Sequence, residues 1–82
     1  MVTVRFFAML KGIAKTETKE YKIDGPITVQ EFKKVLKDDF PNLAPLLEGR
    51  SILISINEEF ADKDTLIRDG DEVGLLPPFS GG

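Results

Sequence analysis

The segment TVQEFKKVLKDDF predicts an amphipathic helix, and this helix most restricts how the chain can fold. Thr28 is a natural N-cap residue, and Glu31 stands three residues later, which is the spacing of a capping box. Pro41 disfavours helical geometry at Phe40 and therefore ends the helix nearby. One face carries the apolar side chains Val29, Phe32, Val35 and Leu36. We expect this face to pack on a sheet, while the lysines Lys33, Lys34 and Lys37 face water.

Two strand patterns precede the helix. Residues 2–8 alternate in polarity, with Val2, Val4, Phe6 and Ala8 in one phase and Thr3, Arg5 and Phe7 in the other. Phe7 is therefore an apolar residue on the polar side of its strand. The segment KGIAKTE indicates a short helical turn or loop, and KEYKID alternates as a second strand paired in a hairpin with the first. Gly25 and Pro26 end this strand.

Strand patterns also follow the helix. The segment NLAPLLEG predicts one short turn that places Leu43, Leu46 and Leu47 under the sheet. SILISINEEF is the strongest strand pattern, with Ile52, Ile54 and Ile56 in one phase and Leu53 and Ser55 in the other, and we expect it to be central. Phe60 begins a short strand. An Asp-Gly turn then leads into the last strand, residues 72–76, with Val73 and Leu75 pointing inward.

This order predicts an α+β fold with one main helix across one face of a mixed sheet. A chain of 82 residues forms one domain with a modest core, so no deep catalytic cavity is expected. The 11 basic and 14 acidic residues give a net charge of -3, which argues against nucleic acid as a partner. The sequence has no cysteine and no histidine, which excludes thiolate or imidazole catalysis and the usual zinc sites.

The first residues, MVTVRFFAML, are apolar but are interrupted by Arg5 and precede no small-residue cleavage site. They predict neither a signal peptide nor a membrane span, so we expect a cytoplasmic protein with no membrane partner.

The chain ends in LLPPFSGG, which predicts an extended arm. Pro77 and Pro78 have no N–H to offer a ladder, so the last strand ends before them. Gly81 and Gly82 lack side chains and can enter a channel too narrow for other residues. A frayed terminus is the alternative explanation of the two glycines. We expect a body of residues 1–76 and a flexible tail of residues 77–82.

Four stretches carry a family resemblance: VRFFAMLKG, TVQEFKKVLKDDFP, SINEEFADKDTLIRDGDEVGLLPP and the terminal SGG. DGDEV followed by PPFSGG is the most specific part, since a Gly-Gly end alone is common. Over nearly its whole length the chain resembles the ubiquitin-like β-grasp sulfur carriers, most closely the small subunit of molybdopterin synthase.

The resemblance implies that Gly82 carries the chemistry and that Gly81 gives it access. In this family a partner activating enzyme adenylates the terminal carboxylate with ATP and magnesium. A persulfide donor then supplies sulfur to form a thiocarboxylate. The large subunit of molybdopterin synthase receives this sulfur for a pterin precursor, producing the dithiolene that binds molybdenum. The chain itself is expected to bind no cofactor and to supply no catalytic base.

The out-of-phase residues predict where partners dock. If the first and last strands are neighbours, Phe7 and Leu76 meet on the sheet face opposite the helix, and Phe60 can join them. We expect the partner-binding residues to be Phe7, Phe60, Leu76, Pro77, Pro78, Phe79 and Ser80. The alternative is that the three apolar side chains are scattered surface or core residues.

Three other functions stay open from the sequence. Gly82 could be joined to lysines of target proteins, which would make the chain a ubiquitin-like modifier. It could serve thiamine synthesis, although those carriers usually lack the extended helical segment of residues 38–47. The chain could also be a β-grasp interaction module without carrier activity.

Overall fold

The computed structural model describes residues 1–49 and 51–77. Of the residues expected to form the tail, Pro78, Phe79, Ser80, Gly81 and Gly82 lie outside the described residues. The described residues make up the body of the protein, with the last strand and the first proline after it.

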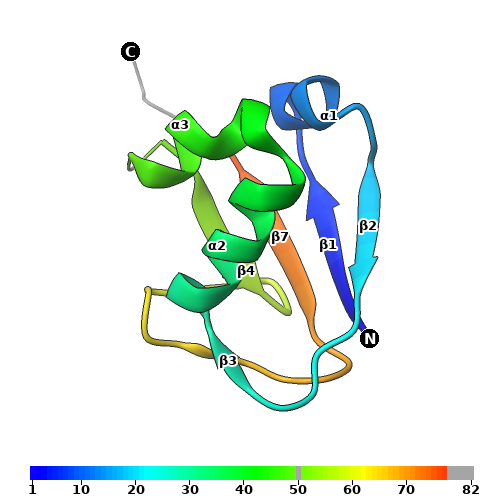
Figure 1. Ribbon diagram of the computed structural model, residues 1–82, viewed down its shortest axis with the longest axis vertical. Helices are drawn as coiled ribbons and strands as arrows, with labels where there is room; N and C mark the ends of the chain where they lie inside the picture. The colour runs from blue at the N-terminus through cyan, green and yellow to red at the C-terminus, as the bar shows by residue number, and fades with distance from the viewer. Residues whose placement is uncertain (50, 78–82) are drawn as a thin grey trace.

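A mixed sheet forms one layer of the molecule (Figure 1). Its strands are β1 (Val2–Phe6), β2 (Thr18–Tyr21), β4 (Leu53–Ile56), β5 (Glu59–Phe60) and β7 (Glu72–Leu76). They lie in the order β2-β1-β7-β4-β5, and β1 and β7 are parallel while the other pairs are antiparallel. The predicted mixed sheet and the neighbouring first and last strands are therefore confirmed.

The central strand is β7, and the prediction that the isoleucine-rich β4 is central was wrong. The isoleucine pattern indicates burial under the helical layer, because Ile54 of β4 and Ile52, which precedes the strand, are buried there. Position within a sheet depends on pairing on both edges. The parallel pairing of β7 with β1 places the last strand between the first strand and β4.

The helices are α1 (Met9–Ala14), α2 (Val29–Asp39) and α3 (Ala44–Glu48), with the 3-10 turn η1 (Pro41–Leu43) between the last two. Figure 1 shows α2 and α3 together on one face of the sheet. The predicted capping box is present: the N–H of Glu31 donates to Thr28 Oγ1 at 3.1 Å, and the N–H of Thr28 donates to Glu31 Oε1 at 3.0 Å. The helix ends just before Phe40 and Pro41, as expected.

The core lies between this helical layer and the inner face of the sheet. Among the described residues fourteen apolar side chains are buried, including Val4 and Phe6 of β1, Phe32 and Leu36 of α2, and Val73 and Leu75 of β7. Val35 was expected in the same face, but its side chain is 41% exposed. At 100° per residue Val35 lies to the side of the face that Val29, Phe32 and Leu36 share, and it borders a shallow hollow beside β2.

Ala8 also departs from the prediction. It was expected to continue the inward phase of the first strand, but it is exposed and has φ 52° and ψ -131°. The strand ends at Phe6, and Ala8 turns the chain into α1. Its side chain is too small to anchor a strand end in the core, so the turn decides its orientation.

A second, two-stranded sheet was not predicted. It pairs β3 (Ile27–Thr28) with β6 (Leu66–Ile67), and the N–H of Val29 donates to the carbonyl oxygen of Thr65 at 2.9 Å. These strands are too short to show a repeating polarity. They hold the start of α2 against the loop after β5, which explains why Ile67 is fully buried.

Candidate functional site

An apolar patch lies on the sheet face that α2 and α3 leave uncovered. We call it the outer patch and define it by Phe7, Leu53, Phe60 and Leu76. The strand registers place Arg5, Gly74, Ser55 and Phe60 in one row across the four strands. In the next row Leu53 lies opposite Leu76. Phe7 extends this second row, because its N–H donates to the carbonyl oxygen of Leu75 at 3.1 Å and so continues the β1–β7 pairing.

Phe7 and Leu76 lie together on this face, as the sequence led us to expect. Both approach the space above Gly74: a Cβ placed on this glycine would lie 3.2 Å from Phe7 Cε2 and 3.5 Å from Leu76 Cδ1. Phe60 occupies the same face one strand beyond Ser55. The interpretation of these three residues as misphased core is therefore wrong.

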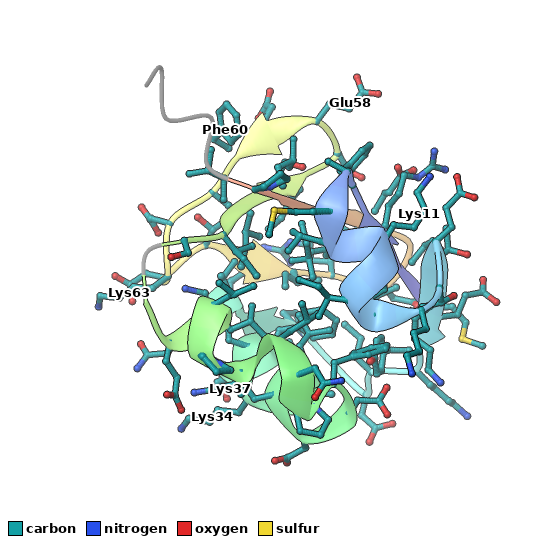
Figure 2. All side chains as sticks on the ribbon, turned by 90° about the horizontal axis from the view of Figure 1, so that it is seen from above. Lys11, Lys34, Lys37, Glu58, Phe60 and Lys63 are labelled. Atoms are coloured by element: carbon teal, nitrogen blue, oxygen red, sulfur yellow. The ribbon has the colours of Figure 1, made fainter. Side chains whose placement is uncertain are left out.

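The outer patch is exposed to solvent to different degrees. Phe60 is 72% exposed, Phe7 and Leu53 are each 38% exposed, and Leu76 is half-buried. Phe60 is the most exposed because β5 is an edge strand and has a neighbour on one side alone. Figure 2 shows Phe60 pointing away from the body on the side opposite Lys34 and Lys37 of α2. Exposed apolar side chains gathered on one face are typical of interaction sites.

Leu53 is a member of the patch that the sequence reasoning did not single out. The signal was present, because Leu53 is out of phase with Ile52 and Ile54, as Phe7 is with Phe6. Leu53 was nevertheless not among the expected partner-binding residues, because the alternating isoleucines are the stronger pattern in that segment. The register of β4 with β7 is what brings Leu53 to Leu76.

The outer patch adjoins the start of the expected tail. Leu76 is the last residue of β7, and Pro77 follows it directly. Pro77 was expected in the projecting arm, but it is buried against the body. A segment that continues from Pro77 thus starts at the edge of the apolar surface, whichever path it takes afterwards.

The other half of this sheet face is polar. Arg5 Nε lies 3.1 Å from Glu72 Oε1, and both side chains are about half exposed. Asn57 Nδ2 donates to Asp71 Oδ1 at 3.0 Å, while the N–H of Glu72 donates to Asn57 Oδ1 at 3.0 Å. Following β7 from Glu72 to Leu76, the face therefore changes from charged to apolar.

The Asp-Gly segment before β7 is a turn, as predicted. Gly70 has φ 92°, which favours glycine, and the N–H of Arg68 donates to Asp71 Oδ2 at 2.8 Å. The Asp71 carboxylate thus bonds to the backbone of the same turn. The turn therefore needs no bound ligand to explain its residues.

Tyr21 and Asp39 form a hydrogen-bonded ionisable pair. The hydroxyl of Tyr21 donates to Asp39 Oδ2 at 2.5 Å, which joins β2 to the end of α2. Burial, followed by this hydrogen bond and the Asp39 charge, raises the pKa of Tyr21. A tyrosine held neutral in this way cannot act as a base, so we assign the pair to structure.

Within the described part of the chain no three metal-binding side chains cluster. Among the same residues no helix is long and apolar enough to cross a bilayer. The shallow hollows border α2, one beside Lys19 and Tyr21 and one beside Lys34 and Glu48. The chemically suggestive feature of the body is therefore the outer patch and its position next to Pro77.

The chain is similar to known proteins over nearly its whole length. The profile of the ThiS family matches residues 4–82. The molybdopterin synthase sulfur carrier subunit of Escherichia coli (strain K12) is 32% identical over 82 residues, covering 100% of both chains. The protein of the same name from Drosophila yakuba is 30% identical over 84 residues, covering 99% of this chain and 90% of that one.

Solved structures share the fold. SAMP1 from Haloferax volcanii superposes with a TM-score of 0.80 at 30% identity, covering 99% of this chain and 98% of that one. A chain of the complex of subunits 1 and 2 of molybdopterin-converting factor from Helicobacter pylori 26695 superposes with a TM-score of 0.70 at 30% identity, covering 99% and 97%.

Proposed function

Because the chain belongs to the ThiS family of sulfur carriers and has the ubiquitin-like β-grasp fold, we propose that it is the sulfur carrier of molybdenum cofactor biosynthesis. Full-length relatives with that function in their names support the proposal. The observation that carries it in this molecule is the outer patch at the end of β7, next to Pro77.

The proposed chemistry takes place at Gly82. A free carboxylate is a poor electrophile, so one oxygen must first become a good leaving group. An activating enzyme does this by adenylation, and ATP and magnesium are bound by that enzyme rather than by this chain. The outer sulfur of a persulfide donor then attacks the activated carbonyl carbon and displaces AMP, and a thiol cleaves the remaining S–S bond, which releases the thiocarboxylate and leaves a disulfide on the donor. Glycine at position 81 keeps the approach to the carbonyl carbon unhindered.

The large subunit of molybdopterin synthase is the proposed recipient of the sulfur. The Helicobacter pylori relative was solved as a protein–protein complex of subunits 1 and 2, which supports a two-subunit assembly. The catalytic groups belong to that partner in our proposal, because this chain has no cysteine or histidine. An ATP-dependent activation step is consistent with a cytoplasmic location.

We propose that the outer patch anchors the body to both partners. Phe60 and Phe7 offer aromatic surface that is already exposed, and such side chains are frequent anchors of interfaces. Since the activating enzyme and the large subunit would cover the same residues, they bind in turn. The Arg5–Glu72 pair borders the patch and would lie at the polar rim of either interface.

Reconstitution tests the proposal. The chain is incubated with the activating enzyme, ATP, magnesium and a persulfide donor, and its intact mass is measured before and after addition of the large subunit and pterin precursor. We expect one oxygen of the C-terminus to be replaced by sulfur and then restored as the dithiolene forms. Deletion of Gly82, or Gly81→Val, should abolish both changes without altering thermal unfolding, since the core lies in the body.

Other outcomes would contradict the proposal. Sulfur transfer that survives deletion of Gly82 would exclude the carrier mechanism. Diglycine remnants on lysines of other proteins, with no thiocarboxylate turnover, would favour the modifier. Transfer to thiamine precursors in place of the pterin would favour the thiamine pathway.

A further inference from the structure

Gly74 lies in the middle of the central strand and is surrounded by side chains of the outer face. It is buried, and it pairs with Arg5 on one side and Ser55 on the other. A Cβ at this position would lie 2.5 Å from Ser55 Oγ, 3.2 Å from Phe7 Cε2 and 3.5 Å from Leu76 Cδ1. Ser55 Oγ thus overlaps the space that a Cβ would occupy, the Phe7 ring crowds it, and Leu76 lies at ordinary contact distance.

Backbone conformation does not account for this glycine. The positive-φ glycine among the described residues is Gly70, whereas Gly74 has φ outside the left-handed region. Glycine inside a strand weakens the strand and marks a bend or a close approach of another group. No bulge interrupts the register of β7 with β1 or β4. The close approach of the Phe7 ring, Leu76 and Ser55 is the remaining explanation.

We propose that Gly74 is a positioning residue for partner docking, because its missing side chain lets the Phe7 ring settle on the sheet beside Leu76. This inference rests on the proposed docking role of the outer patch. Phe7 is 38% exposed, and its Cε2 lies 3.2 Å from the position of a Cβ on Gly74, so part of the ring lies over the glycine. A ring held in place before binding loses less conformational freedom when the partner arrives.

A side chain added at position 74 would contact both Phe7 and Ser55, and Ser55 Oγ is the closest atom to the added Cβ. The experiment must therefore distinguish the effect on Phe7 from the effect on Ser55. All variants are therefore made in a Ser55→Ala background, which removes that clash. Gly74→Ala then adds one methyl group toward Phe7, and Gly74→Val adds more volume in the same direction. Alanine and valine both suit a strand better than glycine, so the variants should fold. Thermal unfolding checks this.

Affinity for the large subunit is the first readout. Relative to Ser55→Ala alone, we expect Gly74→Ala to weaken binding several-fold and Gly74→Val to weaken it by about tenfold, as for loss of an interface anchor. The same comparison is repeated with Phe7→Ala in every variant. If Gly74 acts through the Phe7 ring, Gly74→Val should reduce the affinity for the large subunit only slightly in the Phe7→Ala background. An equal loss with and without the ring would overturn the inference.

A second readout does not involve the partner. One Hα proton of Gly74 occupies the direction of the missing Cβ and so faces the Phe7 ring. We expect a ring-current shift of this proton in the NMR spectrum of the wild-type protein that disappears in Phe7→Leu. An Hα shift unchanged by Phe7→Leu would show that the ring is not seated there and would overturn the inference.

The two hypotheses can fail separately. If Phe7→Ala leaves the affinity for the large subunit unchanged, Gly74 has no docking role to support and the inference is wrong. The carrier function would still stand in that case if sulfur transfer depended on Gly82. Loss of the carrier function is judged from the intact mass of the wild-type chain and of the Gly82 deletion, in both of which position 74 is unchanged.

Discussion

Leu53 and Leu76 lie opposite each other on β4 and β7, on the face of the sheet that the helices leave open. Leu53 lies in the most hydrophobic strand pattern of the sequence but out of phase with its buried isoleucines. Leu76 is the last residue of the last strand. Their pairing joins Phe7, on one side of β7, to the surface around Phe60, on the other. The outer patch is therefore a product of three strand pairings rather than of one local segment.

Phe60→Glu should weaken binding to both the large subunit and the activating enzyme by about tenfold or more, which corresponds to about 1.4 kcal/mol. Burying a charge in an apolar interface without a partner is unfavourable. The fold should be unaffected, because Phe60 is on an edge strand and mostly exposed. Titration calorimetry with each partner measures the effect.

Leu66→Glu is the matched control for that substitution. Leu66 is also an exposed apolar residue, 44% accessible, but it belongs to β6 in the second sheet. It should leave both affinities unchanged. Equal losses for the two variants would show that general surface charge, rather than the outer patch, governs binding.

Leu36→Ala should destabilise the protein by about 2–5 kcal/mol, as a large-to-small change in a core does. Leu36 is fully buried on the sheet-facing side of α2. Val35→Ala, one residue earlier, should cost no more than about 1 kcal/mol because that side chain is partly exposed. Urea unfolding of the two variants compares them. Similar losses would contradict the assigned orientation of the helix.

Thr28→Ala should lower the free energy of unfolding by about 1 kcal/mol near neutral pH by removing the capping hydroxyl of α2. The backbone N–H of Thr28, and then its side chain, hold the pKa of Glu31 below its ordinary value. Because the pKa of Glu31 is lower in the folded state than in the unfolded state, its ionised carboxylate stabilises the protein at pH values above the unfolded-state pKa. This stabilisation is lost as the pH falls through the folded-state pKa.

The effect of Thr28→Ala should therefore shrink in acid but not vanish, because the bond from the Glu31 N–H to Thr28 Oγ1 does not depend on ionisation. Chemical unfolding across the acid range measures this. A difference between wild type and variant that grows as Glu31 is protonated would contradict the capping assignment.

Tyr21 is the sole tyrosine in the sequence, so its ionisation can be followed directly by ultraviolet absorbance. We expect it to titrate above the ordinary value of about 10, first because of burial and then because of the bond to Asp39. Because the pKa of Tyr21 is higher in the folded state than in the unfolded state, its neutral hydroxyl stabilises the protein at pH values below the unfolded-state pKa. This contribution is lost as the pH rises through the folded-state pKa.

Asp39→Asn should lower the apparent pKa of Tyr21, because it removes the charge while leaving the burial. The folded variant should keep a pKa above that of free tyrosine, since burial is the larger cause. Absorbance titration of both proteins decides this. An unchanged titration would mean that the hydroxyl does not donate to Asp39 in solution.

Local patterns in the sequence determined those features that depend on neighbours along the chain. The capping box and the end of α2 follow from Thr28, Glu31 and Pro41, and the bounds of β7 follow from an Asp-Gly turn and a proline. The alternation of polarity within each strand also shows that Phe7 and Leu76 are out of phase with the buried residues beside them. Each of these signals needs only the chemistry of residues a few positions apart.

Tertiary structure alone decided which strands meet. Pairing with β1 and β4 makes β7 central, brings Leu53 to Leu76 and places Gly74 beneath Phe7, although these residues are distant in the chain. Long-range pairing also formed the second sheet from β3 and β6. Polarity along a strand specifies which face a side chain takes, but strand order depends on long-range contacts that no local pattern encodes.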